Sequence, residues 1–299
     1  MRTDKKFFGT AALVVVILLL CACIVGTASG CQKKLEMTVL ESTIDIGIEQ
    51  SFTVLHASDT HITLYSKSDK SELISKAKNR SKRFGRNQEK NLEFVTDLSK
   101  EKGCKVIHTG DFMDFPTNAN IDRLKKFLEE TDCLYIPGNH ETETTPDYYK
   151  KIADASTRDI SFYQEEINGV LFVGFDNSDH KVTAEQFAKL KAAVETGKPV
   201  VLFCHVPLFA KELYDKSILD DGSAYLMAVP EELMKNYPEK RYNDQKADEV
   251  TYEAYEYIKA QENIKGILAG HVHFSLESKV GNIPQYVVGL NTVRLVTIK

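Results

Sequence analysis

Residues 105–114 read KVIHTGDFMD, a short apolar run that ends in a glycine and two aspartates. The run Lys105–Thr109 has the Val- and Ile-rich composition of a strand buried on both faces. Asp111 and Asp114 follow it directly, where a parallel strand brings its carboxyl end to the edge of a sheet. Ligands bind at that edge in open α/β sheets. The stretch therefore predicts a buried strand that presents carboxylates to a ligand site.

Four other apolar runs end in the same way, in Asp, Asn or His. Phe52–Ala57 precedes SDTH (58–61), Cys133–Ile136 precedes PGNHE (137–141), Pro199–Cys204 precedes His205, and Gly266–Ala269 precedes GHVH (270–273). Each motif alone is a weak signal, because an Asp after a strand is usually a turn or helix cap. Five in order, holding five of the chain's eight histidines, predict a single site.

Helical spacing appears between the predicted strands. Three apolar faces recur at helical spacing, formed by Leu92, Val95 and Leu98, by Ile121, Leu124 and Leu128, and by Phe187, Leu190 and Val194. Thr183 and Gln186 form a capping box before the third. Further strands are expected at Val170–Phe175 and Gln285–Val288. Strands alternating with helices predict an α/β fold with parallel pairing. The strand-rich tail, with a hairpin turn at Gly281-Asn282, adds an antiparallel section.

Two connections, residues 62–86 and 206–245, are longer than the rest of the pattern requires. Long connections of this kind tend to be functional or disordered. Residues 62–86 carry eight Lys or Arg against Asp69 and Glu72. This composition favours a solvated helix or loop, with binding of the anionic side of a substrate as the alternative. Residues 206–245 are candidates for a pocket wall through Phe209, Tyr214 or Tyr225.

The series D-x-H, G-D-x-x-D, G-N-H-E, H and G-H-x-H, complete over residues 52–274, resembles the signature of the calcineurin-like metallophosphoesterases. The resemblance implies an α/β fold in which two mixed β-sheets pack as a sandwich flanked by helices. It also implies a hydrolase that cleaves phosphomono- or phosphodiesters by attack of a metal-bridging hydroxide at a dinuclear site. Residues 32–299 would form this domain.

The resemblance also assigns roles to residues of this chain. One divalent ion would be held by Asp59, His61, Asp111 and His273, and the other by Asp111, Asn139, His205 and His271. His140, oriented by Asp114, would be the catalytic histidine. A bridging carboxylate suits a metal pair about 3.5–4 Å apart. The ligand types suit Mn, Fe or Zn without selecting among them.

Several residues and chemistries fall outside this assignment. His56, His108 and His180 are left out, because the first two lie within strands and the third has no motif. Purple acid phosphatases carry Tyr where this chain has Asp114, so an Fe(III)–tyrosinate site is not expected. The sequence has no G-x-S-x-G elbow, no H-E-x-x-H and no Walker A loop.

Two other functions compete with a hydrolase of small phosphate esters. One is a non-catalytic envelope binding protein on the same scaffold, and the other is a nuclease. The net charge of −5 lacks the basic excess of a nucleic-acid binder, so nucleic acid is not expected as a partner. The expected partner is a phosphate-ester substrate. The natural ester and the oligomeric state stay open.

Residues 1–31 predict a signal or anchor segment. The uncharged run 7–28 follows Arg2, Lys5 and Lys6, which is typical of a secretory signal or an N-terminal membrane anchor. Either lipidation of a cysteine in the segment or an uncleaved helix would hold the body at the outer face of a membrane. The body cysteines, Cys104, Cys133 and Cys204, have no C-x-x-C spacing and are expected to be buried thiols.

Overall fold

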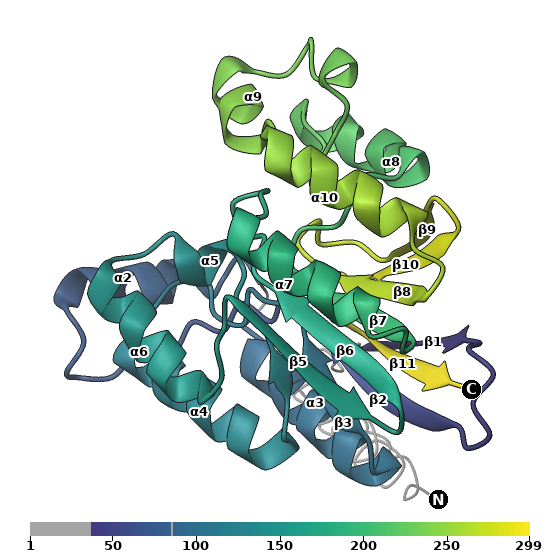
Figure 1. The fold of residues 1–299 in the computed structure, drawn as a ribbon. Helices are drawn as coiled ribbons and strands as arrows, with labels where there is room; N and C mark the ends of the chain where they lie inside the picture. Colours follow the sequence, from purple (N-terminus) through teal and green to yellow (C-terminus); the bar gives the residue numbers. More distant parts are fainter. Residues whose placement is uncertain (1–36, 85) are drawn as a thin grey trace, which may run out of the picture. The chain divides into compact units, whose positions relative to one another are not determined.

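Two mixed β-sheets form the centre of the structure, a computed structural model that describes residues 37–84 and 86–299 (Figure 1). The first sheet has the order β1-β11-β2-β3-β4, and β2, β3 and β4 run parallel. Its strands are β1 (Thr38–Ile44), β2 (Phe52–Ala57), β3 (Lys105–His108), β4 (Leu134–Tyr135) and β11 (Thr292–Ile298). The antiparallel pairing of β11 with β2 makes this sheet mixed.

The second sheet has the order β5-β6-β7-β8-β10-β9. The four central strands run parallel, and the outer strands β5 and β9 are antiparallel to their neighbours. Its strands are β5 (Phe162–Ile167), β6 (Val170–Phe175), β7 (Val200–Phe203), β8 (Ile264–Ala269), β9 (Leu276–Val280) and β10 (Ile283–Val287). The β9–β10 hairpin turns at Gly281 and Asn282, as the sequence predicted.

Helices cover the outer faces of both sheets. α3 (Gln88–Lys102), α4 (Asn118–Thr131) and α6 (Pro146–Ser156) lie with the first sheet, and α7 (Ala184–Glu195) and α10 (Glu249–Ala260) with the second (Figure 1). Shorter elements near the sheet ends are α2 (Ser71–Arg80), α5 (Asn139–Thr142), α8 (Lys211–Asp221), η1 (Glu231–Leu233) and α9 (Glu239–Gln245). The predicted apolar faces lie on α3, α4 and α7, and Thr183 caps α7 in the predicted capping box.

The main hydrophobic core lies between the two sheets. Ile44, Val54 and Ile107 of the first sheet belong to the same buried cluster as Phe172 and Phe203 of the second. A separate cluster fills the space between the outer face of the first sheet and helices α3 and α4. The predicted sandwich of two mixed sheets flanked by helices is confirmed.

The sequence analysis missed two strands and placed the ends of several others one residue too far, with β4 and β7 each shorter by one residue at both ends than predicted. β1 and β5 both lie at a sheet edge and alternate between exposed and partly buried side chains. A search for continuous apolar runs therefore passes over them. β4 spans only Leu134–Tyr135, shorter than the predicted run Cys133–Ile136. Ile136 still donates a hydrogen bond to the carbonyl oxygen of His108, at 3.3 Å, but Pro137 follows it and has no N–H with which to extend the pairing.

The predicted leader and its boundary at residue 31 lie outside the described residues, so anchoring at a membrane stays a prediction. Within residues 37–84 and 86–299, no helix combines the length and apolar character that a membrane span requires. Cys133 and Cys204 are buried thiols and Cys104 is half-buried, and none of the three forms a disulfide.

The centre of the second sheet gives a test of the packing. Gly174 lies in β6, and a Cβ atom there would come within 2.4 Å of the Phe203 ring. We expect Gly174→Ala to lower the free energy of unfolding by about 1–3 kcal/mol, because a tightly packed core must move to accept a methyl group. Thermal denaturation of the purified chain measures the change. A melting temperature equal to that of the wild type would contradict the packing described here.

Candidate metal centre

The five motifs meet where strands of both sheets end. Asp59 and His61 follow β2, Asp111 follows β3, and Asn139 begins α5 just after β4. His205 follows β7 of the second sheet, and His271 and His273 follow β8. Because the two sheets pack face to face, these loops from opposite sheets reach a common point. All seven residues predicted to bind metal lie within this cluster.

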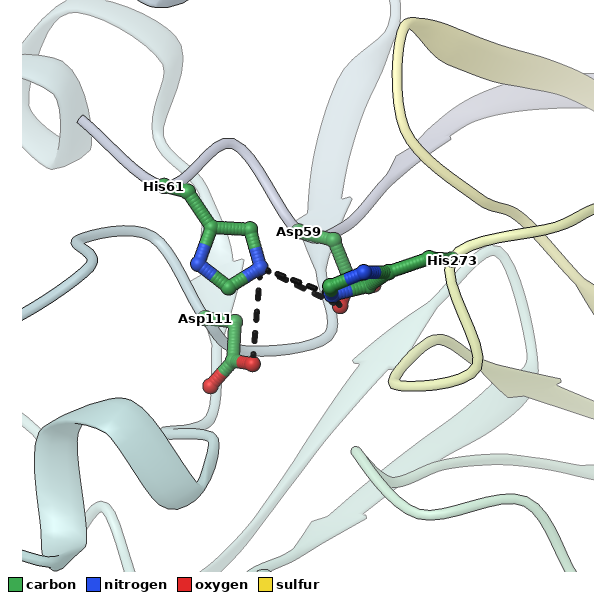
Figure 2. A group of neighbouring side chains, drawn as sticks. All are labelled: Asp59, His61, Asp111 and His273. Atoms are coloured by element: carbon green, nitrogen blue, oxygen red, sulfur yellow. Dashed lines mark hydrogen bonds and ion pairs between the residues drawn. The ribbon is translucent and has the colours of Figure 1, made fainter. Parts of the chain in front are cut away.

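One group consists of Asp59, His61, Asp111 and His273, and Figure 2 shows their side chains converging. The Nε2 atom of His61 lies 3.7 Å from Asp59 Oδ1, 3.7 Å from Asp111 Oδ2 and 3.0 Å from His273 Nε2. His273 Nε2 lies 3.5 Å from Asp59 Oδ1. Two imidazoles and two carboxylates thus direct their ligand atoms into one small space.

A second group consists of Asp111, His205 and His271. His205 Nε2 lies 3.4 Å from Asp111 Oδ2, 3.1 Å from His271 Nδ1 and 3.3 Å from the side-chain oxygen of Asn139. The other ring nitrogen of His205, Nδ1, lies 2.7 Å from the carbonyl oxygen of Thr109. If Nδ1 donates its proton to that carbonyl, the lone pair of Nε2 faces the group. Asp111 belongs to both groups.

The backbone of the cluster is strained. Five of the predicted ligands have a positive φ angle: Asp59 at 54°, His61 at 48°, Asp111 at 49°, His271 at 69° and His273 at 59°. Residues with a side chain rarely adopt this left-handed conformation, and each instance costs on the order of 1–3 kcal/mol. Strain of this kind collects at functional sites and persists only where the surrounding structure enforces it.

Glycines in the motifs permit the close approach of the ligand loops. A Cβ atom on Gly138 would lie 2.2 Å from the Asp111 carboxylate, and one on Gly270 would lie 1.8 Å from the Ser58 hydroxyl and 2.4 Å from Asp59. Neither position can take a side chain without moving a predicted ligand. The positions before Asn139 and His271 therefore require glycine, because a side chain there would clash with a neighbouring ligand loop.

The polar atoms of the cluster fit a metal ion. Asp59 Oδ1, which faces His61 and His273, is buried and makes no hydrogen bond to any residue in the described part of the chain. Buried polar atoms without a partner are costly, and a bound cation supplies one. Oxygen and imidazole ligands without thiolate suit Mn, Fe or Zn.

The electrostatic field of the cluster also favours a cation. Burial lowers the pKa of His205, yet the Asp111 carboxylate outweighs burial and raises it to about 9. His271 and His273 have lowered pKa values, chiefly because they are buried, and stay neutral with lone pairs available. The pKa of Asp111 lies well below its usual range, because the surrounding histidines outweigh its burial. The carboxylates therefore attract positive charge to this point.

His140 is held at the edge of the cluster by Asp114. Its Nδ1 atom lies 2.7 Å from the backbone oxygen of Asp114 and 3.3 Å from Oδ1 of the carboxylate. The opposite nitrogen, Nε2, lies 4.0 Å from Asp111 Oδ2. Burial lowers the pKa of His140, but Asp114 and Asp111 together raise it to about 10. The ring therefore has one nitrogen fixed to Asp114 and the other directed toward the predicted ligands.

The basic segment 62–86 forms the mostly exposed helix α2 and adjoining turns, as favoured, but two of its side chains also contact this site. Arg80, in α2, donates two hydrogen bonds to the Asp114 carboxylate, at 2.5 and 2.6 Å. Phe84 stacks on the His61 ring with centroids 4.6 Å apart and planes at 6°. Both residues were missed, because a run of charges does not reveal which side chains turn inward.

Glu141 was also missed as a functional residue, although it lies in the G-N-H-E motif. Its buried carboxylate accepts hydrogen bonds from the backbone N–H groups of Asp111, Met113 and Gly138, at 3.0, 2.8 and 2.7 Å. Burial and the nearby Asp111 carboxylate raise its pKa to about 7, against the effect of these donors. Glu141 thus joins the loop after β3 to the loop after β4.

The histidines that were left out lie beside the cluster. His56 and His108 are buried within their strands and contact the hydroxyls of Thr109 and Thr60. Burial is the largest cause of their lowered pKa values, which keep both rings neutral. His180 packs against His271, with ring centroids 5.3 Å apart.

Comparison with known proteins gives a family match over most of the chain. The family model described as calcineurin-like phosphoesterase matches residues 52–275. No curated protein matches the chain. The chain is also similar to parts of three solved structures. A dimetal phosphatase from Danio rerio is 13% identical, with a TM-score of 0.48, and the alignment covers 80% of this chain and 88% of that one.

The other two structures are more distant. A calcineurin-like phosphoesterase from Bacillus subtilis is 12% identical with a TM-score of 0.39, covering 81% of this chain and 82% of that one. The phosphopantetheinyl hydrolase from Mycobacterium tuberculosis is 12% identical with a TM-score of 0.37, covering 80% and 90%.

The role of Glu141 can be tested through metal binding. We expect Glu141→Gln to weaken Mn²⁺ binding by about 10-fold or more, because an amide cannot accept all three backbone N–H bonds that fix the Asp111 loop. Calorimetric titration of the purified chain with Mn²⁺ measures the affinity. Glu143→Gln, an exposed position two residues away, is the matched control and should bind as the wild type does. Unchanged affinity in Glu141→Gln would refute this role.

Proposed function

The chain belongs to the calcineurin-like phosphoesterase family, and from this membership we propose that it is a metal-dependent hydrolase of phosphomono- or phosphodiesters with a dinuclear site. The observation that carries the proposal is the pair of ligand groups that share Asp111. Asp111 Oδ2 faces both groups, and a carboxylate oxygen in that position can bridge two cations. Asp59, His61 and His273 would complete one side, and Asn139, His205 and His271 the other.

Two divalent ions, when bound, would withdraw electron density from a phosphoryl group and lower the pKa of a bound water toward about 7. The remaining chemistry falls to the chain's own residues. Hydrolysis adds water to phosphorus and breaks one ester P–O bond, so the departing oxygen needs a proton. His140 Nε2 faces the ligand cluster, 4.0 Å from Asp111, and is placed to donate that proton.

Asp114 and Arg80 control the orientation of His140. The Asp114 contacts at Nδ1 keep a proton on that nitrogen and direct Nε2 toward the cluster. The Arg80 guanidinium binds the same carboxylate with two hydrogen bonds, which fixes its plane. Arg80 is therefore a positioning residue, since it acts on the reaction only through Asp114 and His140.

The proposal predicts a contrast between two substitutions. The purified full chain with Mn²⁺ should hydrolyse p-nitrophenyl phosphate or bis-p-nitrophenyl phosphate, and EDTA should abolish the activity. Asp111→Ala should lose both turnover and Mn²⁺ binding. His140→Ala should still bind Mn²⁺ and should lower kcat by about 10²–10⁴-fold, the usual contribution of a general acid, on phenyl phosphate, and by less on the p-nitrophenyl esters. Mn²⁺ binding by the wild type without turnover of either ester would favour a non-catalytic binding protein.

The positioning role of Arg80 predicts a dependence on the leaving group. Arg80→Met should lower kcat more for phenyl phosphate esters than for p-nitrophenyl esters, because the poorer leaving group depends more on a well-placed proton donor. Arg80→Lys, which keeps the charge but not the two parallel hydrogen bonds, should recover part of the loss. Steady-state kinetics on both ester series measure the difference. An equal fall for both series would show that Arg80 supports only the fold.

A further inference from the structure

Two clefts open beside the predicted metal ligands. The first, which we call the metal-side cleft, has a volume of about 570 Å³ and is lined by Asp111, His271 and His273. The second, the helix-side cleft, has a volume of about 600 Å³ and lies along α2 and the start of α6. Both volumes fall in the range of about 300–1,000 Å³ that is usual for ligand sites. Asn139 and His140 line both clefts.

The ligand positions determine where a phosphoryl group would lie. The shared carboxylate, Asp111, lines only the metal-side cleft, so the reacting phosphorus belongs there. The His140 ring stands at the junction, with Nε2 toward Asp111. An ester oxygen protonated by His140 would therefore carry its organic group past the ring and into the helix-side cleft.

The metal-side cleft is large enough for a second organic group, and aromatic and basic side chains line it. Tyr225 and Phe274 line it together with Arg83 and Arg241. The Tyr225 ring lies 5.8 Å from the His271 ring, and the Arg241 guanidinium lies 4.9 Å from the Tyr225 centroid. Tyr225 has a φ of 53°, a strained conformation that typically marks ligand-binding positions. The backbone N–H of Tyr225 donates a hydrogen bond to the buried side chain of Gln245, at 3.0 Å.

The two clefts differ in charge. Apart from His140, which lines both clefts, the charged residues of the metal-side cleft are two arginines and the ligand Asp111. The rest of the helix-side cleft balances three basic residues with three acidic ones, namely Lys70, Lys76, Arg80, Glu72, Asp114 and Glu143. Its apolar lining includes Leu73, Phe115 and Tyr148. This balance suits an organic group that is uncharged or zwitterionic, rather than a second phosphate.

We propose that the substrate is a phosphodiester, with one organic group in each cleft. The inference rests on the proposed function and narrows it, because a monoester would leave one of the two clefts without a ligand. Water adds to phosphorus, the P–O bond to the group in the helix-side cleft breaks, and His140 protonates the departing oxygen. The products are an alcohol and a phosphomonoester, whose organic group stays against Tyr225.

Three substrates with the same leaving group test the proposal on the Mn²⁺-loaded full chain. They are bis-p-nitrophenyl phosphate, methyl p-nitrophenyl phosphate and p-nitrophenyl phosphate. We expect kcat/KM to fall in that order, with the first at least about tenfold above the last, a factor equal to about 1.4 kcal/mol. A kcat/KM for the monoester equal to or higher than that for either diester would overturn the phosphodiester assignment. Hydrolysis of none of the three would instead overturn the proposed function.

Substitutions then assign each organic group to its cleft. Leu73→Trp should fill the helix-side cleft and lower kcat/KM for both diesters, without changing inhibition by inorganic phosphate. Ser75→Trp, an exposed position on the same helix, is the matched control and should behave as the wild type. Tyr148→Ala, which removes a lining ring and adds no bulk, should also lower kcat/KM and covers the case in which Leu73→Trp fails to fold.

Tyr225→Ala tests the metal-side cleft. It should reduce the preference for the bis-p-nitrophenyl ester over the methyl ester, because only the group that stays on phosphorus differs between them. Calorimetric binding of a phosphonate analogue, in which a CH2 group replaces the bridging oxygen of the leaving group, gives a readout independent of turnover, and its affinity should fall in Leu73→Trp. Wild-type affinity and kcat/KM in a folded Leu73→Trp chain would exclude the helix-side cleft as a substrate site.

Discussion

The carboxylate of Asp111 is the group on which the rest of this site depends. It faces His61 from the first sheet at 3.7 Å and His205 from the second at 3.4 Å, through the same oxygen. Neither sheet alone holds both ligand groups, so the site exists only when the sandwich is packed. The buried core between the sheets therefore supports both the fold and the arrangement of the ligands, and a change in its packing would shift the ligand positions.

Asp111 is held in place by several features that are each energetically unfavourable on their own. Its backbone has a positive φ, its carboxylate leaves no room for a side chain at Gly138, and its N–H is bound by the buried Glu141. The same loop carries Asp114, which Arg80 fixes from α2. Such support keeps strained groups converged on one point, where a cation would relieve the mutual repulsion of the carboxylates.

Much of the fold and of the ligand cluster could be predicted from the sequence, because both depend on local patterns. Buried parallel strands read as continuous apolar runs, and their carboxyl ends are marked by Asp, Asn and His. The edge strands β1 and β5 escaped this reasoning, since exposed and partly buried residues alternate along them. Arg80 and Phe84 lie in a long connection, and their contacts with the site depend on tertiary packing that no periodicity encodes. Tyr225 was named only as one of three candidates for a pocket wall, and it lines the metal-side cleft.

The most direct test is a crystal structure of the chain grown with Mn²⁺, with anomalous diffraction used to locate the metal. Two peaks about 3.5–4 Å apart on either side of Asp111 are expected for a bridged pair. One should contact Asp59, His61 and His273, and the other Asn139, His205 and His271. A single ion that does not touch Asp111, or no metal at this point, would contradict the dinuclear centre.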